Sequence, residues 1–448
     1  MVLTNSDTKR QNISEGEAFL VDRISNLPDS VLSYILTFLP TKRVIATSIL
    51  SKRWRYVWTS VDKLDLHDFY CCKRFDIKGH FAPFVYRVLK LHQGNIRDLS
   101  LSCSTRGCNE ADVTNWINTA VARGVERLLV RTQFEYTWPL TIFTCKTLVD
   151  LQLNKLDTRN MDIPDASFLP CLKKLTVGYL KFDTESLKHF ISRCPVLEHF
   201  VNKLHNQCIN QVIQFDIVSS RLKQIELNAS TYDFDKKVYL DLDIPTLEFF
   251  RFMSILPPEI AIQEQLTFLV EADISVLNFY SHDININQLR ESFVRFIQPF
   301  TNVRVLRLRC HLSKFLTSVG HAQFDNLTTL EIVSTYFEWR LLVSLMENSI
   351  NLEDITLKKT PKLKKHKLAW EEPKNVPTCL STSLRKISLD GYSEDELPMV
   401  EYVLRTAKIL EQMDIHSSTC YGDEDEWKAV MLQKIQKLHR VSENVKFH

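Results

Sequence analysis

The chain is dominated by a short apolar pattern, L-x-x-L-x-L, in which another apolar residue can replace leucine. Eleven copies lie between Ile96 and Ile415, and one of them is Leu148-x-x-Leu151-x-Leu153. In the two most regular stretches, positions 128 to 250 and 306 to 355, the middle residues of successive copies are 23 to 25 residues apart. Near-equal steps of this kind indicate a structural repeat.

The repeat predicts the fold class. A period of 20–29 residues is typical of leucine-rich repeats. Alternating apolar positions within each copy indicate a short strand whose apolar side chains point inward. One such strand cannot bury its apolar face alone, whereas stacked neighbours form a continuous core. We therefore predict an α/β fold in which residues 67–357 form a leucine-rich-repeat solenoid with parallel strands.

A different pattern precedes the repeats. Residues 1–19 are mostly polar, so we predict a disordered tail there. Between Pro28 and Pro40, apolar residues at i, i+3, i+4 and i+7 predict an α-helix. We expect Thr41 and Ser51 to cap two further short helices, the second of which carries Trp54 and Trp58. Residues 20–66 are thus predicted to form a small unit of three helices.

The last quarter of the chain contains an interruption and a final segment. Lysines and prolines are concentrated in residues 358–376, which we predict to be a basic linker. Its lysine run, 358–367, is typical of a solvated loop, a nuclear-import or docking patch, or a nucleic-acid contact. Residues 377–448 contain two more strand patterns and a helix predicted through Glu396–Leu404.

The glycine content excludes several enzyme classes. The chain has 9 glycines in 448 residues, and the closest two, Gly94 and Gly107, are thirteen positions apart. Loops that bind phosphate need several glycines within about six or seven residues, because the backbone must approach the phosphate closely. P-loop NTPases, Rossmann dinucleotide-binding proteins, kinases with a glycine-rich loop and hydrolases with a G-x-S-x-G elbow are therefore excluded.

The charge and hydropathy of the chain limit the kinds of partner that we expect it to have. Lys plus Arg is 56 and Asp plus Glu is 54, so the net charge is +2, and we expect no nucleic-acid partner. No stretch approaches 18 apolar residues, so no membrane span is expected. The 11 cysteines are an odd number and the first twenty residues lack the apolar core of a signal peptide. We predict free thiols and a location in the cytoplasm, the nucleus or both.

No pattern in the sequence predicts a metal, a cofactor or a catalytic residue. The cysteines lack the paired short spacing of structural zinc sites, and the histidines form no H-E-x-x-H motif. Cys145, Cys171 and Cys194 lie just before repeat patterns, where a small apolar side chain packs well, so we expect no catalytic thiol. The chain is therefore predicted not to be an enzyme.

The strand pattern also predicts a recognition surface. If Leu151 and Leu153 point inward, then the residues at alternate positions point outward. The outward residues that we expect to bind a partner are Gln152, Glu226, Arg307, Arg309 and Glu331. These residues mix positive and negative charges, which favours a protein partner over a polyanion. The alternative is that they only form a solvated face.

Both ends of the chain resemble a known family. The N-terminal segment resembles the F-box of plant F-box/leucine-rich-repeat proteins through Leu27-Pro28-Asp29, Ile35-Leu36, Phe38 to Lys42 and Ser48 to Trp58. The segment 377–448 is similar to the C-terminal FBD module of the same family. The matching residues there are Val376-Pro377, Cys379-Leu380, Ser383-Leu384, Gly391-Tyr392, Glu401-Tyr402, Ala407-Lys408, Leu410 and Val445-Lys446-Phe447.

The resemblance implies a function. F-box proteins are substrate-recognition subunits of SCF-type (Skp-cullin-F-box) ubiquitin ligases: the F-box binds a Skp-type adaptor, the adaptor connects it to a cullin and a RING subunit, and the repeats bind the target protein. Carried over by motif, the adaptor-binding residues are Leu27, Pro28, Leu32, Ile35, Leu36, Leu39, Pro40, Leu50, Trp54 and Trp58.

Other functions remain open from the sequence. The chain can instead be a leucine-rich-repeat scaffold outside any ligase, whose F-box is unused or serves an adaptor outside the cullin complex. A small ligand inside the solenoid is also conceivable, although no cluster of basic side chains indicates one. The sequence does not name the protein substrate.

Overall fold

The computed structural model describes two compact units, Met1–Phe134 and Glu135–His448. The residues described are 24, 26–68, 80–104, 107–134, 136–157, 168–181, 184–203, 212–230, 237–262, 266–276, 286–310, 318–334, 339–359, 370–392, 394–417, 433–443 and 445–447. The predicted disordered tail, 1–19, lies outside them. We describe each unit by itself.

The first unit begins with the three predicted helices. They are α2 (Asp29–Leu36), α3 (Thr41–Ala46) and α4 (Trp54–Val57), and two single 3₁₀ turns, η1 (Thr47–Ile49) and η2 (Trp58–Ser60), follow α3 and α4. Their core is formed by Leu32, Leu36, Val44, Trp54, Val57 and Trp58, all of them buried. The 3.6-residue period of apolar positions explains this inward face.

Thr41 has a role that differs from the predicted helix cap. It is the first residue of α3, and no side-chain hydrogen bond caps that helix. Its buried hydroxyl instead accepts the backbone N–H of Asp65, with 2.6 Å between Oγ1 and N. Asp65 lies in β1 (Lys63–His67), so this hydroxyl satisfies a backbone donor of the first strand. A side chain of the helical unit therefore contacts β1 directly.

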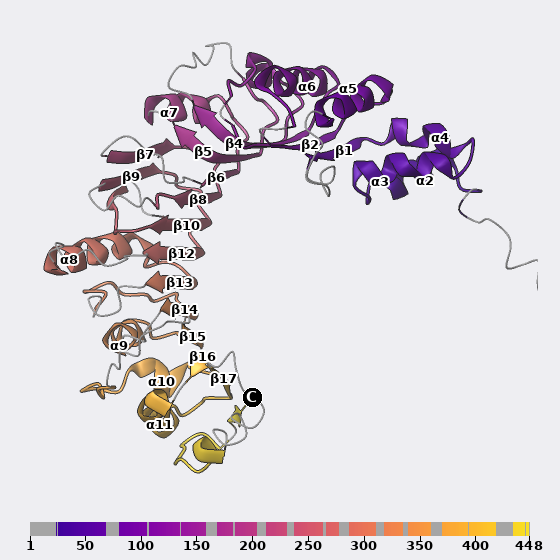
Figure 1. Ribbon diagram of the computed structural model, residues 1–448. Coiled ribbons are helices and arrows are strands. Elements are labelled where there is room, and N and C mark those ends of the chain that lie inside the picture. Colours follow the sequence, from indigo (N-terminus) through magenta and orange to yellow (C-terminus); the bar gives the residue numbers. More distant parts are fainter. Residues whose placement is uncertain are drawn as a thin grey trace, which may run out of the picture. The chain divides into compact units, whose positions relative to one another are not determined.

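Three parallel strands complete the first unit, in the order β1-β2-β3 (Figure 1). β2 (Asp98–Cys103) pairs with β1 and with β3 (Arg127–Thr132). The connections contain α5 (Phe81–Leu91) and α6 (Glu110–Ala122), and Asn109 and Asp112 form a capping box at the start of α6. Leu64 and Leu66 of β1 are buried and lie level with Leu99 and Leu101 of β2, so β1 has the same apolar alternation as the strands that follow it.

The second unit is built around one long parallel sheet. Figure 1 shows its strands stacked one beside the next. In order they are β4 (Asp150–Asp157), β5 (Lys174–Lys181), β6 (His199–Lys203), β8 (Gln224–Asn228), β10 (Phe249–Ser254), β12 (Glu271–Val276), β13 (Val305–Cys310), β14 (Thr329–Ser334), β15 (Asp354–Lys359), β16 (Lys386–Tyr392), β17 (Gln412–Ser417) and β18 (Lys446–Phe447). The predicted parallel-strand α/β class is confirmed.

The strands align so that equivalent positions of successive repeats are neighbours. Leu151 is level with Leu175 in the next strand, and Leu175 is level with Phe200. The same row continues to Met413, and all of its residues are buried. One continuous apolar column therefore runs through the unit, as the repeat period predicts.

Helices lie on one side of this strand stack (Figure 1). They are α7 (Thr184–Ser192), α8 (Ile286–Ile297), α9 (Trp339–Glu347), α10 (Thr378–Thr382) and α11 (Leu397–Thr406), with the 3₁₀ turns η4 (Leu140–Thr144), η5 (Gln298–Phe300) and η6 (Glu394–Glu396). The helix expected through Glu396–Leu404 is thus confirmed as α11. Phe250 of β10 stacks on Phe300, and Phe252 packs edge-on against Phe296, which anchors η5 and α8 to the core.

A second, three-stranded sheet was not predicted. It consists of β7 (Val212–Val218), β9 (Lys237–Asp243) and β11 (Glu259–Ile262), all parallel, in the order β11-β9-β7. Its buried side chains alternate: Ile213, Phe215 and Ile217 in β7, and Val238, Leu240 and Leu242 in β9. The alternation was visible in the sequence, but it falls between copies of the repeat pattern.

The C-terminal segment continues the solenoid. β16 pairs in register with β15, and β17 pairs with β16, so both strands extend the same sheet. β15 includes Lys358 and Lys359, the first two lysines of the predicted linker, whereas residues 360–369 lie outside the described part of the chain. The Ser442 hydroxyl donates to the Leu410 carbonyl at 2.7 Å, and β18 pairs with Gln412 and Met413. Ser442 and β18 therefore lie against the edge formed by Leu410 and β17.

The strand register predicts a large loss of stability for a charged substitution at Leu151 and almost none at its neighbour Gln152. Leu151→Asp places an unpaired charge in the apolar column, and we expect it to lower the free energy of unfolding by at least about 3 kcal/mol. Gln152→Asp, whose side chain points away from the column, should change it by less than about 0.5 kcal/mol. Denaturant melts of the two variants test this, and equal effects would contradict the register.

A buried histidine in the first unit predicts a pH dependence. His92 Nε2 lies 2.7 Å from the Val61 carbonyl oxygen, so Nε2–H donates. Nδ1 lies 3.4 Å from Arg123 Nη1. Burial is the largest effect and lowers the pKa of His92. The hydrogen bond to Val61 raises this pKa by less, and the charge of Arg123 lowers it further. The imidazole is therefore neutral in the folded chain at pH 7.

The sign of the effect follows from this lowered pKa. Its stabilising contribution is present above the unfolded pKa of about 6.5 and is lost as the pH falls through the lower folded pKa. We expect the melting temperature of the full chain to fall more between about pH 7 and about pH 5 than that of His92→Gln, which keeps a donor but does not titrate. Parallel slopes would rule out His92 as the cause.

Candidate functional site

Helix α2 has three chemically distinct faces. Leu32 and Leu36 point into the core. A second face leaves apolar side chains exposed, namely Val31, Ile35, Phe38 and Leu39, the last two of which follow the helix. The third face carries the hydroxyl groups of Ser30, Ser33 and Thr37. Apolar residues that are not needed for the core are unusual on a helix surface and indicate a partner.

More exposed apolar residues follow α3. Ile49 is 85% exposed and Leu50 is 65% exposed, and Tyr56 on α4 is equally open. Phe38, at 72%, packs edge-on against Tyr34, which is also exposed. The helical unit therefore buries one set of apolar residues and presents another to a partner, as a docking module does.

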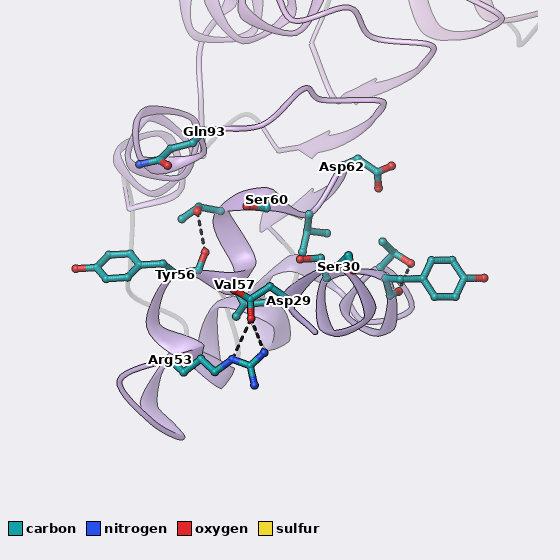
Figure 2. A pocket seen from close by; sticks show the side chains of 13 residues that line it. Asp29, Ser30, Arg53, Tyr56, Val57, Ser60, Asp62 and Gln93 are labelled. Carbon is teal, nitrogen blue, oxygen red and sulfur yellow. Dashed lines mark hydrogen bonds and ion pairs between the residues drawn. The ribbon is translucent and has the colours of Figure 1, made fainter. Parts of the chain in front are cut away.

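Arg53 holds the start of α2 against the start of α4. Its Nη2 and Nε contact Asp29 Oδ1 at 2.7 and 3.0 Å (Figure 2), and Nη2 also donates to the carbonyl of Leu27. A guanidinium that contacts both a carboxylate and a carbonyl fixes the direction in which the chain enters α2. The exposed face of α2 is thus held in a defined orientation.

The hydroxyl face of α2 borders a groove of about 640 Å³. Figure 2 shows the groove with Asp29, Ser30, Arg53, Tyr56, Ser60, Asp62 and Gln93 around it. Asp29 is paired with Arg53, and Asp62 lies 3.5 Å from Arg97, so both of its carboxylates have a cationic neighbour. The groove is hydroxyl-rich and nearly neutral, unlike the apolar face of the same helix.

The outward face of the second unit contains a ladder of ion pairs. Glu226, Arg251, Asp273, Arg307 and Glu331 lie side by side in five successive strands, β8 to β14. Arg251 contacts Glu226 and Asp273, each at 2.9 Å. Arg307 contacts Glu331 at 3.2 Å and also pairs with Glu271. Each charge in this ladder is compensated by a neighbouring strand.

Asp273 is the centre of the ladder. Its side chain is 0% exposed although it belongs to the outward face, because Arg251 and Arg309 cover it. Arg309 Nη1 lies 2.6 Å from Asp273 Oδ1, and Arg251 Nε lies 2.9 Å from Oδ2. A buried carboxylate needs such partners, since its desolvation is costly. The two arginines are therefore structural as well as outward-facing.

Comparison with known proteins identifies the family. An F-box domain matches residues 24–66, an FBD matches residues 371–415, and the model described as "FBD-associated F-box protein At5g56370, LRR repeats" matches residues 113–294. The F-box/LRR-repeat protein At3g59200 of Arabidopsis thaliana is 31% identical to this chain over 93% of it and 86% of the relative. The chain belongs to the plant F-box/FBD/leucine-rich-repeat family.

Two further relatives from Arabidopsis thaliana agree. The FBD-associated F-box protein At5g56380 is 28% identical, over 94% of this chain and 98% of the relative. The F-box/FBD/LRR-repeat protein At2g04230 is 30% identical, over 87% of this chain and 88% of the relative. The resemblance seen in the sequence is thereby confirmed, and an F-box implies binding of a Skp-type adaptor.

The structure separates the ten predicted adaptor-binding residues into two groups. Pro28, Ile35, Leu39 and Leu50 are exposed, and Leu27 and Pro40 are half-buried. Leu32, Leu36, Trp54 and Trp58 are buried in the F-box core. The motif carries both kinds of residue because a docking surface has to be supported by a packed interior. Which of them contact the adaptor stays a prediction.

Sequence reasoning did not single out several exposed residues of the F-box. Tyr34, Phe38, Ile49 and Tyr56 are among its most exposed side chains. The signal available in the sequence was that α2 has more apolar residues than its core needs, since that core uses only Leu32 and Leu36. These four residues extend the apolar surface around Ile35, Leu39 and Leu50.

The predicted substrate-facing residues all lie on strands of the second unit. Gln152, Glu226, Arg307 and Glu331 share one row of the strand face, and Arg309 lies two positions after Arg307. Both arginines emerge on the same side, as expected. They are engaged with Asp273, Glu271 and Glu331, so reversing their charges would disrupt ion pairs between neighbouring strands as well as change the charge of the outward face.

The described residues include no cluster of metal ligands, and two of their cysteine thiols have strongly raised pKa values. Among them, no group of three or more His, Cys, Asp or Glu side chains could hold a metal ion. Burial raises the pKa of the Cys194 thiol to about 12 and that of the Cys379 thiol to about 12, so both are protonated at neutral pH. Nor does any described helix combine the length and apolar character that crossing a bilayer requires.

The ladder predicts that the coupling energy within the Arg309–Asp273 ion pair is larger than that within an exposed ion pair. Arg309→Gln should lower the free energy of unfolding by about 1–3 kcal/mol, because Asp273 loses a partner while it stays buried. The exposed pair Arg385–Glu411 serves as the control, and its coupling should be below about 0.5 kcal/mol. Double-mutant cycles with Asp273→Asn and Glu411→Gln measure both energies, and equal couplings would refute the structural role.

Proposed function

We propose that this chain is the substrate-recognition subunit of an SCF-type ubiquitin ligase. The observation that supports this most is the exposed apolar face of the F-box, formed around Ile35, Phe38, Leu39 and Leu50. It lies over a complete core, so these residues are available to a partner without unfolding the module. A Skp-type adaptor would cover this face and connect the chain to a cullin and a RING subunit.

The reaction itself would occur outside this chain. A ubiquitin ligase of this class needs its receptor to hold a substrate lysine near the activated ubiquitin, which raises the effective concentration of the lysine. The receptor supplies no nucleophile, base or metal in this scheme. We accordingly propose that the chain is not an enzyme by itself and that it works in the cytoplasm or the nucleus.

The strand face of the second unit is the proposed substrate-binding surface. Its charges are compensated from strand to strand, as with Arg307 between Glu271 and Glu331. A surface of this kind attracts neither a polyanion nor a polycation over long distances, and it favours a protein partner that matches local charges and shape. The second candidate function, a scaffold outside any ligase, would use the same surface.

The F-box test uses exposed residues only. Ile35→Asp combined with Leu50→Asp removes two apolar contacts and adds charge, and it should weaken adaptor binding by at least roughly 100-fold. Leu27 is a less suitable position, because its carbonyl accepts from Arg53 and its side chain is half-buried. Binding of the purified full chain to a Skp-type adaptor is measured by calorimetry.

The matched control is Phe268→Asp in the second unit. Phe268 is as exposed as Leu50, at 65%, but lies far along the chain from the F-box. It should leave adaptor binding unchanged, and all variants should keep the wild-type melting temperature. Unchanged adaptor affinity in the Ile35/Leu50 variant would refute the docking surface. Adaptor binding without capture of a cullin would favour the scaffold over the ligase.

A further inference from the structure

One edge of the main sheet carries a row of charged residues that is interrupted at β12. In each repeat from β5 to β17, the residue just before the strand accepts, through its carbonyl, the N–H of the equivalent residue in the next repeat. This edge row consists of Lys173, Glu198, Lys223, Glu248, Val270, Arg304, Thr328, Glu353, Arg385 and Glu411. Opposite charges on neighbouring strands stabilise a sheet, and they alternate from Lys173 to Glu248. Val270 breaks this alternation with an apolar side chain.

Phe268 adds an aromatic ring beside this interruption. It is the third residue of the turn 266–269, which a backbone hydrogen bond of 3.2 Å closes. The turns before the two neighbouring strands are closed in the same way, and Thr246 and Asn302 occupy the equivalent position there. Phe268 is 65% exposed and Val270 is 45% exposed, so neither side chain is needed for the core. Exposed apolar residues that lie together indicate a partner.

Two half-buried strand residues extend this apolar surface. The Val270 N–H donates to the Glu248 carbonyl at 2.9 Å, and the Val270 carbonyl accepts from the Val305 N–H at 3.1 Å. Phe249, which follows Glu248, and Val305 therefore flank Val270 on its two sides. The Arg251 guanidinium lies 5.2 Å from the centroid of the Phe249 ring, which connects this surface to the ion-pair ladder. We call these four residues the edge patch: Phe249, Phe268, Val270 and Val305.

An unpaired cation lies beside the edge patch. Arg304 is exposed, and its two neighbours in the edge row, Val270 and Thr328, are uncharged. Within the described part of the chain Arg304 forms no ion pair, whereas Arg385 of the same row pairs with Glu411. A guanidinium in this situation is available to bind a carboxylate from a partner through two parallel hydrogen bonds.

We propose that the edge patch and Arg304 bind an acidic segment of the target protein, in which an apolar side chain lies close to a carboxylate. The apolar side chain packs against Phe268 and Val270, and the carboxylate pairs with Arg304. Exposed aromatic residues and arginines are enriched at the energetic centres of protein interfaces. Glu271, the first residue of β12, is compensated by its ion pair with Arg307, so its charge does not exclude an acidic segment.

This inference rests on the proposed role of the second unit as a partner-binding surface, and it holds for a ligase subunit and for a scaffold alike. The probe is a library of random peptides of about 12 residues, long enough to cover the patch and its flanks, displayed on phage and selected on the purified full chain. We expect the selected peptides to share an aliphatic or aromatic residue within a few positions of an aspartate or glutamate.

The selected peptides are then synthesised, and their affinities for variants of the full chain are measured by fluorescence anisotropy. Phe268→Asp should weaken their binding at least about 10-fold, because it removes the aromatic contact and adds a repelling charge. Arg304→Glu should weaken it at least about 5-fold. Peptides in which lysine replaces the acidic residue should prefer Arg304→Glu to the wild type, a reversal that a purely structural effect of the substitution would not produce.

Ile350→Asp is the matched control. Ile350 is 46% exposed, almost as much as Val270, and lies in the turn before β15. This variant should bind the peptides as the wild type does, and all variants should keep the wild-type melting temperature.

Several results would overturn the proposal. They are a library that yields no binding peptide, selected peptides without the apolar and acidic pair, and equal affinities for Phe268→Asp and the wild type. A wild-type dimer that Phe268→Asp dissociates would show that a second copy of the chain covers the patch, and it would also overturn the proposal. Because no adaptor is present, a chain that binds the adaptor but no such peptide refutes this inference alone, and the reverse result refutes only the F-box docking surface.

Discussion

The in-register stacking of one apolar residue per repeat is the constraint on which the second unit depends. Leu151, Leu175 and Phe200 begin a column that every later strand of the main sheet continues. Since side chains along a strand alternate between two faces, the register that buries this column also aligns the outward residues. Arg251 is placed beside Asp273, and Arg307 beside Glu331, for this reason alone. The arrangement of charges on the outward face is thus a consequence of core packing.

The F-box also divides its residues between a core and an outward surface, but there the outward residues include apolar ones. Its helices are short, and a core of six side chains is enough to hold them together. The remaining apolar residues, such as Phe38 and Leu50, stay exposed, which is costly for an isolated domain and favourable once a partner covers them. Thr41 shows how closely this module is joined to the first strand, because its hydroxyl satisfies a backbone donor of β1. Within this one motif, some residues are therefore exposed for docking, and others form the interior that supports them.

Much of the fold could be predicted from periodicity, whereas much of the site could not. The three helices, the parallel strands and the helix near Leu397 all follow from local apolar spacing. The sheet of β7, β9 and β11 was missed because its alternating residues fall between copies of the main pattern. The ladder pairs are separated by 22 to 36 residues, close to one repeat but not constant, so spacing alone does not pair Arg309 with Asp273. Whether an apolar side chain of the F-box is buried or exposed also depends on the direction in which it points, which the motif does not encode.

The repeat, the three N-terminal helices and the lack of a glycine-rich phosphate-binding loop could be predicted from the sequence, because each depends on residues within a single local stretch. The burial of Asp273 under two arginines, and the exposure of Ile35 beside the buried Leu36, follow only from the packing of the folded chain. These features depend on how neighbouring segments shield one another from water and bring their side chains together. A local pattern shows which residues prefer to be buried, and the packing of distant segments determines which of them are.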